Sequence, residues 1–260
     1  MPATHVVDCY DYPQYWDLAF REDTKLEATF IEAATRKFCK FPVRRLCEAG
    51  CGGGRLVVEL AARGFALTAL DQNAATVAYL QKRLRRRKLT ANILLEDMAD
   101  FQLPSKVDAA FCLTNTFRHL TSESQALSHL RSMARNLRKG GIYILGFHLY
   151  PPEADLVKIE KWSAKHGKTH VDFMLRALEY VPEKRYETLR FFLRVRSGQR
   201  NLKLQSDYRY RTYTARQFRR LLKSVPEFKL LEVFDFWFDI EEPQDFDDEL
   251  GDAVFVLRKQ

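Results

Sequence analysis

The sequence predicts an α/β fold built on a doubly wound, mostly parallel sheet of seven strands, with an antiparallel β insertion. Short apolar segments alternate with helical patterns over residues 43–147, which is typical of βαβ units and a parallel sheet. A glycine-rich turn stands between the first of these strands and the helix after it. Beyond residue 150 the pattern changes to the two-residue alternation of antiparallel strands.

Helices and strands follow one another in regular order over the first 150 residues. Apolar side chains recur at helical spacing in residues 24–40, where Thr24 is expected to cap the start and Pro42 to end the pattern. The other expected helices and strands, in chain order, are 43–49 (strand), 56–63 (helix), 65–70 (strand), 74–87 (helix), 93–95 (strand), 107–113 (strand), 122–137 (helix, stopped by Lys139-Gly140-Gly141) and 142–147 (strand). Because crossovers between parallel strands are right-handed, the helices should cover both faces of the sheet.

The second half of the chain adds an insertion and then completes the sheet. Strands are expected at 170–180, 185–196 and 201–213, with Ser197-Gly198-Gln199 as the turn between the last two. A helix at 214–224, capped by Thr214, and strands at 230–238 and 253–257 follow. We therefore expect one domain from residues 1–150 and 214–260. Residues 151–213 should form an antiparallel β insertion that roofs the ligand site.

Composition places the chain among ordinary globular proteins. It has 260 residues, of which 46% are hydrophobic and 29% charged. Its five cysteines show no zinc-type spacing, and an odd, scattered set fits reduced thiols in the cytoplasm. The first twelve residues lack the features of a signal peptide, and no apolar run approaches the roughly 18 residues of a membrane span. We expect a soluble cytoplasmic protein without a bound metal or membrane contact; the sequence does not predict its oligomeric state.

The net charge of +8 is unevenly distributed. Lys82–Lys88 carries six bases, whereas Asp235–Asp252 carries nine acids and no base. A basic balance leaves nucleic acid open as a partner. However, Lys82–Lys88 ends a helix that should run away from the ligand edge of the sheet. The acidic connection 239–251 should start on that edge, where it either attracts a cationic molecule or is simply solvated.

The strongest local signal is the segment Glu48-Ala49-Gly50-Cys51-Gly52-Gly53-Gly54-Arg55. Glycine allows positive φ and close approach to a ligand, and a loop between strand and helix directs backbone N–H groups into the crevice. The spacing is G-x-G-x-G; the dinucleotide fingerprint would need glycine where Arg55 stands. Asp71 ends the next strand, 71 − 52 = 19 positions after Gly52, where a carboxylate can bind two ribose hydroxyls.

This segment resembles the first motif of the class I S-adenosylmethionine (SAM)-dependent methyltransferases, acid-x-Gly-x-Gly-x-Gly, matched by Glu48, Gly50, Gly52 and Gly54. The resemblance implies a Rossmann-like methyltransferase fold, SAM as cofactor and S-adenosylhomocysteine as product. It also implies that the motif lines the methionine and ribose part of SAM and that Asp71 holds the ribose. The candidate cofactor site further includes Cys51 and Gln72. The alternative is a tight turn that binds nothing.

Two further positions fit the same family. An acid after the third strand binds the adenine amino group there, and the next residue packs on the ring; Asp97 and Met98 match these roles. Otherwise Asp97 is a turn or cap residue. The resemblance also places Leu113, at the end of the fourth strand, beside the transferring methyl group.

The substrate region resembles the small-molecule branch, such as glycine/sarcosine and amino-sugar N-methyltransferases. The Asn/Asp-Pro-Pro-Tyr sequence is absent after the fourth strand. The start Tyr-Asp-x-x-x-Tyr is present as Tyr10–Tyr15, and a β-rich insertion follows the fifth strand. Tyr15, with Tyr10 and Trp16, is expected to cover SAM as a lid; packing of the first helix onto the sheet is the alternative.

His119 is the candidate catalytic base, because it follows the fourth strand and histidine titrates near neutrality. The alternative is a histidine packed at the start of a helix. Five other residues at strand ends are weighed as pocket lining against a structural role: His148, Tyr150, Tyr208, Tyr210 and Arg211.

The sequence therefore predicts a SAM-dependent methyltransferase that acts on a small-molecule acceptor, with an amine as one candidate. A sulfonium is already an excellent leaving group, so the protein mainly aligns donor and acceptor and excludes water. The alternatives are an RNA methyltransferase, suggested by the pI of 9.2, and a catalytically inactive SAM-binding protein.

Overall fold

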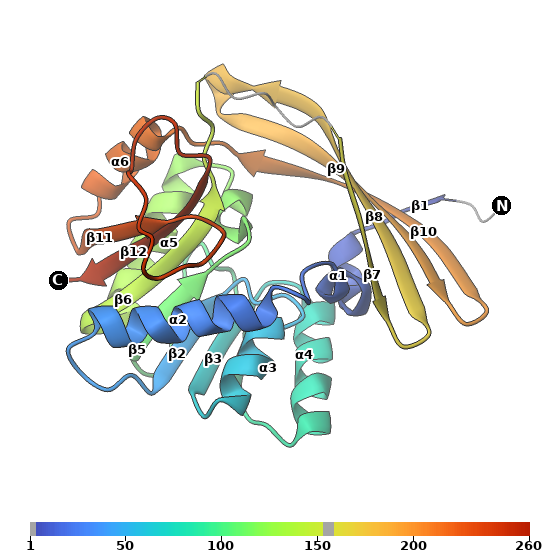
Figure 1. The fold of residues 1–260 in the computed structure, drawn as a ribbon, viewed down its shortest axis with the longest axis horizontal. Coiled ribbons are helices and arrows are strands. Elements are labelled where there is room, and N and C mark those ends of the chain that lie inside the picture. The colour runs from blue at the N-terminus through green and yellow to red at the C-terminus, as the bar shows by residue number, and fades with distance from the viewer. Residues whose placement is uncertain (1–3, 153–158) are drawn as a thin grey trace.

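The computed structural model describes residues 4–152 and 159–260 and arranges them around two sheets (Figure 1). The strands of the larger sheet, in spatial order, are β11 (Phe228–Phe234), β12 (Asp252–Lys259), β6 (Leu137–His148), β5 (Val107–Cys112), β2 (Arg45–Ala49), β3 (Ala66–Asp71) and β4 (Asn92–Leu95). The five strands from β4 to β6 are parallel, and β12 runs antiparallel to both β6 and β11. The predicted doubly wound, seven-stranded sheet is thus confirmed, with one antiparallel strand.

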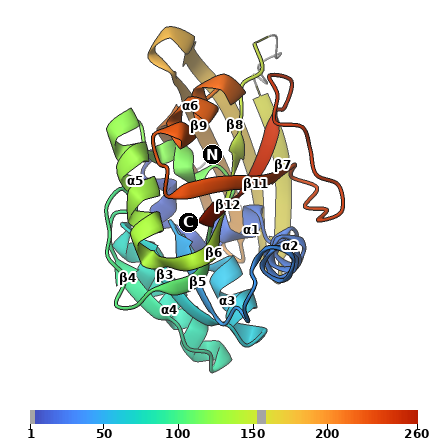
Figure 2. The ribbon, with the colours of Figure 1, turned by 90° about the vertical axis from the view of Figure 1, so that its left-hand side faces the viewer.

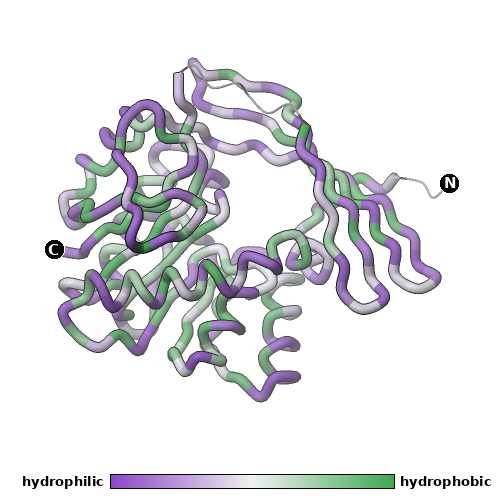
Figure 3. Tube along the Cα trace, viewed as in Figure 1, coloured by the Kyte–Doolittle hydropathy of each residue, from purple (hydrophilic) through white to green (hydrophobic). Residues whose placement is uncertain are grey.

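Helices cover both faces of this sheet (Figure 2). Alternate residues of β6 point to opposite faces, so that Ile142 and Ile144 belong to one apolar cluster and Tyr143 and Leu145 to the other. The first cluster contains α2 (Thr24–Phe38), α3 (Arg55–Ala62) and α4 (Ala74–Arg87); the second contains α5 (Glu123–Asn136) and α6 (Ala215–Lys223). The apolar segments in Figure 3 follow these buried strands. Within the described residues, no helix has the length and apolar character that crossing a membrane requires.

The second sheet contains five strands in the order β1 (Thr4–Val6), β10 (Arg200–Arg211), β9 (Tyr186–Ser197), β8 (Thr169–Val181) and β7 (Ile159–His166). The predicted turn before β10 is present, and Gly198 in it has a φ of +58°. Two of the strands were not predicted. β7 carries many charged side chains, and β1 has only three exposed residues paired with β10, so tertiary pairing rather than local pattern creates them.

Several element boundaries differ from prediction. Thr24 is the first residue of α2 and does not cap it; the cap position is Asp23. Lys139-Gly140-Gly141 lies inside β6. A side chain at Gly141 would stand 2.5 Å from the Asp108 carbonyl oxygen of the neighbouring strand, so glycine there permits the close approach of the two strands. β11 ends at Phe234 rather than Phe238, which has a φ of +53°. Thr214 caps α6 as predicted, whereas Ser122, expected as the first residue of its helix, caps α5; each lies within a capping box.

Candidate active site

A cavity of about 1000 Å³ joins the carboxyl ends of the parallel strands to the inner face of the second sheet. Of the predicted site residues, these line it: Glu48, Gly50, Cys51, Gly52, Gly54, Asp71, Gln72, Asp97, Met98, Leu113 and His119. Tyr10, Trp16, His148, Tyr150 and Tyr210 also line the cavity, whereas Tyr15, Tyr208 and Arg211 do not. The fold therefore brings the cofactor motifs and the candidate base into one space.

The glycine loop adopts a backbone that requires glycine. Gly50, Gly52 and Gly54 have φ values of +68°, +50° and +69°. A Cβ at Gly50 would lie 2.3 Å from Thr116 Cγ2, and one at Gly54 would lie 2.2 Å from Leu80 Cδ1. At Gly52, in contrast, no atom of the described residues stands within 4 Å of such a Cβ. The middle of the loop thus borders open space, which suits close approach of a ligand.

Asp71 connects the glycine loop to the start of α4. Its Oδ2 accepts the Gly52 N–H at 2.8 Å and its Oδ1 accepts the Asn73 N–H at 2.8 Å. Burial raises the pKa of this carboxyl, while the two backbone donors act in the opposite direction. Each oxygen keeps a second acceptor position, so the carboxylate can take two ligand hydroxyls from a fixed orientation.

Glu48 is a buried acid, and its Oε2 has no hydrogen-bond partner among the described residues. Burial raises its pKa well above the usual range, although Arg55 opposes this. The Arg55 Nη2 is itself engaged, 2.7 Å from both Glu27 carboxylate oxygens and 3.0 Å from Thr114 Oγ1. An unpartnered buried acceptor is costly, so this corner of the cavity fits the cationic ammonium of the methionine part of SAM.

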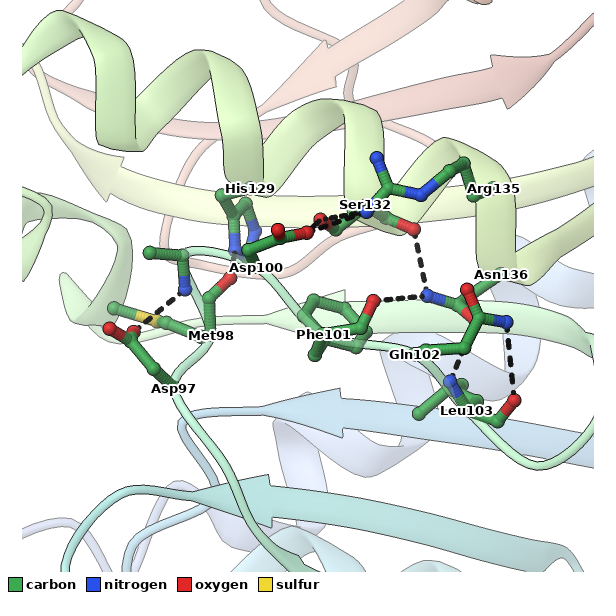
Figure 4. A network of polar contacts seen from close by, with 11 residues as sticks. Asp97, Met98, Asp100, Phe101, Gln102, Leu103, His129, Ser132, Arg135 and Asn136 are labelled. Atoms are coloured by element: carbon green, nitrogen blue, oxygen red, sulfur yellow. Dashed lines mark hydrogen bonds and ion pairs between the residues drawn. The ribbon is translucent and has the colours of Figure 1, made fainter.

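The loop after β4 carries Asp97 and Met98 and is fastened to α5 (Figure 4). Asp97 Oδ1 accepts the Ala99 N–H at 2.8 Å. His129 contacts the Met98 carbonyl oxygen through Nδ1 at 2.7 Å and the Tyr143 hydroxyl through Nε2 at 2.6 Å. A carbonyl only accepts, so Nδ1 carries a proton, and burial favours the neutral form of the imidazole. The sequence analysis missed His129, although this residue lies among the apolar residues of the buried face of α5, which indicated a buried histidine.

Burial lowers the pKa of His129 to about 4, from about 6.5 in the unfolded chain. As the pH falls, the unfolded state therefore binds a proton before the folded state does. The contribution of neutral His129 to the free energy of unfolding is lost as the pH falls from about 6.5 towards 4. We expect urea unfolding of the wild type to lose about 3 kcal/mol through this group over that window. The His129→Gln protein should have a lower free energy of unfolding at pH 7, and this free energy should depend less steeply on pH than in the wild type. Exposed His166→Gln should match the wild type in both respects. Equal slopes in all three proteins would contradict the assignment.

His119 ends a short 3₁₀ helix, η2 (Thr116–His119), that follows β5. Its Nε2 lies 2.9 Å from the Tyr10 hydroxyl, and its ring lies 4.6 Å from that of Tyr210. Burial, assisted by the charge of Arg118, lowers the pKa of His119 to about 4. At neutral pH the side chain is an uncharged hydrogen-bonding group, which makes it a weak proton acceptor.

The N-terminal segment lies between the glycine loop and the second sheet. It contains η1 (Cys9–Asp11) and α1 (Pro13–Ala19). Tyr10 and Trp16 face the cavity, but Tyr15 is buried and its ring stacks on that of Tyr12 at 6.3 Å. Of the residues expected to form a lid, Tyr10 and Trp16 thus line the cavity and Tyr15 does not. Neighbouring side chains of a helix point about 100° apart, which the sequence motif alone does not resolve.

A buried ion pair connects η2 to the second sheet, and the sequence analysis missed it. Arg118 on η2 and Glu187 on β9 are in direct contact, and the Arg118 Nε donates to the Arg211 carbonyl oxygen at 3.0 Å. Both side chains are buried and both border the cavity. A signal existed in the sequence: Glu187 shares its strand face with the apolar residues Leu189 and Phe191.

The two charged segments lie in different places. Lys82–Lys88 forms the last turns of α4 and its cap, away from the start of that helix, which meets the cavity. In the acidic connection, Gly251 and the following Asp252 line the cavity. The other acids of that connection are exposed and do not line it.

Comparison with known proteins agrees with this geometry. Residues 46–141 match the family model described as "Methyltransferase domain". A protein of Geobacillus sp. (strain WCH70), named "Putative methyltransferase", is 21% identical over 141 residues, which cover 54% of this chain and 57% of that protein. The match thus spans little more than half the length of that relative. The central segment of this chain is thus similar to methyltransferase domains.

Solved structures resemble almost the whole chain. A SAM-dependent methyltransferase from Clostridium acetobutylicum ATCC 824 has a TM-score of 0.79 at 14% identity, covering 97% of this chain and 99% of that one. DesVI from Streptomyces venezuelae has a TM-score of 0.79 at 15% identity, covering 98% and 100%. The sugar N-methyltransferase KedS8 from Streptoalloteichus sp ATCC 53650 has a TM-score of 0.73 at 19% identity, covering 94% and 93%. The chain has the fold of the class I SAM-dependent methyltransferases.

Proposed function

We propose that this protein is a SAM-dependent methyltransferase that acts on a small-molecule acceptor. The observation that carries the proposal is the single cavity in which the cofactor motif meets a chamber closed by the second sheet. We assign residues 1–150 and 214–260 to the SAM-binding unit and residues 151–213 to its roof; residues 153–158 of this roof lie outside the described part of the chain. The five free cysteines suit a cytoplasmic enzyme.

The acceptor half of the cavity has an apolar wall and a polar end. Trp16 packs on Phe191 at 4.9 Å, and Phe20 lies 6.4 Å from Trp162. Polar groups at the other end include the Arg118–Glu187 pair. This chamber suits a compact molecule with one apolar face and several polar groups, and the name of KedS8 supports a sugar amine.

An RNA acceptor is less well supported. No residue of the basic segment Lys82–Lys88 lines the cavity, and Arg83 is engaged by Asp17 and the Gly53 carbonyl oxygen. The second sheet bounds the side on which a polymer would approach the methyl group. A small molecule needs no such access.

The residues of the cavity also fit methyl transfer: Glu48, Asp71 and Asp97 hold the cofactor, and Tyr10 and Trp16 help to exclude water. When bound, SAM supplies a methyl group activated on a sulfonium.

His119 is proposed as the residue that orients the acceptor. It lines the cavity at the end of η2, the 3₁₀ helix that follows β5, and its neutral ring is held by the Tyr10 hydroxyl. A neutral imidazole can donate a hydrogen bond to the methyl acceptor or accept one from it, without repelling a cationic amine. Its low pKa suits this role better than the storage of a proton.

The cofactor assignment is tested by Asp71→Ala, which should weaken SAM binding by about 1–3 kcal/mol because buried polar groups are left unpaired. Isothermal titration calorimetry with SAM and S-adenosylhomocysteine measures the change. Asp245→Ala, at an exposed position outside the cavity, is the control and should bind as the wild type does. Unchanged affinity in a folded Asp71→Ala protein would remove the assignment.

The acceptor class is tested by release of S-adenosylhomocysteine from SAM with a panel of amino sugars, simple alcohols and total RNA. Turnover with an amino sugar supports the proposal. Turnover with RNA alone, with a steep dependence on salt, would replace it by the RNA reading. Tight SAM binding without turnover of any of them would identify a protein that binds SAM and does not catalyse.

A further inference from the structure

The order of strands separates a cofactor side of the cavity from an acceptor side. Along the carboxyl edge, Asp97 follows β4, Asp71 ends β3, the glycine loop follows β2 and Leu113 follows β5. Adjacent strands lie about 4.8 Å apart, so these positions follow an extended ligand from adenine to methyl group. The next two strands in the same direction are β6 and β12, whose residues at this edge therefore lie on the acceptor side.

His148 and Asp252 occupy that position. His148 is the last residue of β6 and Asp252 the first of β12, and they are direct cross-strand partners. Their side chains meet at 2.5 Å between Nδ1 and Oδ1, and both residues line the cavity. Each side chain is about half exposed, 44% and 51%, so a ligand in the cavity can reach them.

The backbone and the ring of His148 are both held in place. Its backbone N–H donates to Asn115 Oδ1 at 2.9 Å, in the turn that follows β5. The Phe236 ring packs on it at 5.0 Å, and Asp252 contacts Nδ1. An ionised carboxylate only accepts hydrogen bonds, so Nδ1 carries the proton of the neutral ring. Nε2 then keeps its lone pair, and no described residue forms a hydrogen bond with it.

The two histidines of the cavity differ in this respect. Nε2 of His119 is 2.9 Å from the Tyr10 hydroxyl, and no carboxylate in the described part of the chain forms a hydrogen bond with its ring. His148 has a free Nε2 and a carboxylate that would stabilise the imidazolium after proton uptake. A histidine oriented by a carboxylate is the arrangement that general bases use in hydrolases of several folds.

We propose that His148 is the general base that removes a proton from the acceptor amine and that Asp252 is its positioning residue. The inference rests on the proposed methyl transfer to a small amine. The ammonium form of the acceptor gives one proton to Nε2 of His148, which becomes an imidazolium paired with Asp252. The freed nitrogen lone pair forms the new N–C bond, and the C–S bond breaks with its electron pair on sulfur. The nitrogen becomes a methylated ammonium and the sulfur a neutral thioether, so charge is conserved.

The first test needs no acceptor and follows the tautomer of His148 by ¹⁵N NMR of histidine-labelled protein, assigned with His148→Gln. The wild type should show the proton on Nδ1, and Asp252→Asn should remove this preference. Asp172→Asn is the matched control, because Asp172 contacts His170 at 2.9 Å and neither residue lines the cavity. A wild-type His148 with its proton on Nε2, or one insensitive to Asp252→Asn, overturns the proposal.

The second test measures turnover of SAM with glucosamine as the probe amine. His148→Ala should lower kcat by about 10²–10⁴-fold, with SAM affinity unchanged, and added imidazole should restore part of the rate. Asp252→Asn should also lower kcat, because an amide can hold the opposite tautomer. His170→Ala should match the wild type.

The outcomes separate this inference from the proposed function. If the wild type turns over and both His148→Ala and Asp252→Asn keep its kcat, the base assignment is wrong and the methyltransferase proposal stands. If loss of kcat in His148→Ala is not relieved by imidazole, the side chain has a structural role and the base assignment is again wrong. If the wild type binds SAM without turning over any amine, the proposed function fails, while the tautomer measurement still decides the Asp252–His148 relation.

Discussion

Replacement of Arg118 by methionine is expected to lower the free energy of unfolding by about 3–5 kcal/mol. Methionine has a similar reach but no charge, so the Glu187 carboxylate would stay buried without a counter-ion. The substitution also removes the donors to the Arg211 carbonyl and to Asn115 Oδ1. Because Arg118 joins η2 to β9, the loss should loosen the second sheet over the cavity. Urea unfolding at pH 7 measures the change.

The same sheet supplies a matched control in an exposed ion pair. Arg190 on β9 and Asp207 on β10 are in contact at 2.6 Å, with about a third of each side chain exposed. Arg190→Met should cost less than about 1 kcal/mol, since exposed pairs contribute little. The double variant Arg118→Met/Glu187→Leu should recover part of the loss because no charge remains buried. Equal costs for Arg118→Met and Arg190→Met would show that burial does not set the value of the Arg118 pair.

Substitution of His119 by alanine is expected to lower kcat by about 10²-fold while SAM affinity stays within about twofold. We expect this loss because the neutral His119 side chain, hydrogen-bonded to Tyr10, is proposed to orient the methyl acceptor. Without the side chain, the methyl acceptor would be misplaced. Since the pKa of His119 is lowered to about 4, its protonation should not affect kcat between pH 8 and 5 and should matter only as the pH approaches 4. Steady-state kinetics together with calorimetry provide both measurements.

The control for this experiment is His166→Ala, at an exposed position of β7 that does not line the cavity. His119→Asn should retain more activity than alanine, because the amide can still accept and donate hydrogen bonds. Near-normal turnover of His119→Ala would return the residue to a packing role between Tyr10 and Tyr210. A parallel loss of SAM affinity would instead place His119 on the cofactor side.

The cofactor motif was predictable because its chemistry is local. The glycine spacing, the strand before it and Asp71 at the end of the next strand all lie within a single βαβ unit, where sequence distance translates directly into spatial distance. The helix 74–87 and the cap Thr214 were likewise predicted to the residue, since capping depends on neighbours three positions apart.

The contacts that complete the cavity were decided by the tertiary structure. Arg118 meets Glu187 across 69 positions of chain, and His148 meets Asp252 across 104. Strand pairing fixes such contacts, and a shift of one residue would turn either side chain to the opposite face. By itself, the sequence determined the seven-stranded sheet and the glycine motif that lines the cavity. The tertiary structure alone decided what closes the acceptor side, because pairing in the second sheet and at the edge of the first depends on partners distant in the chain.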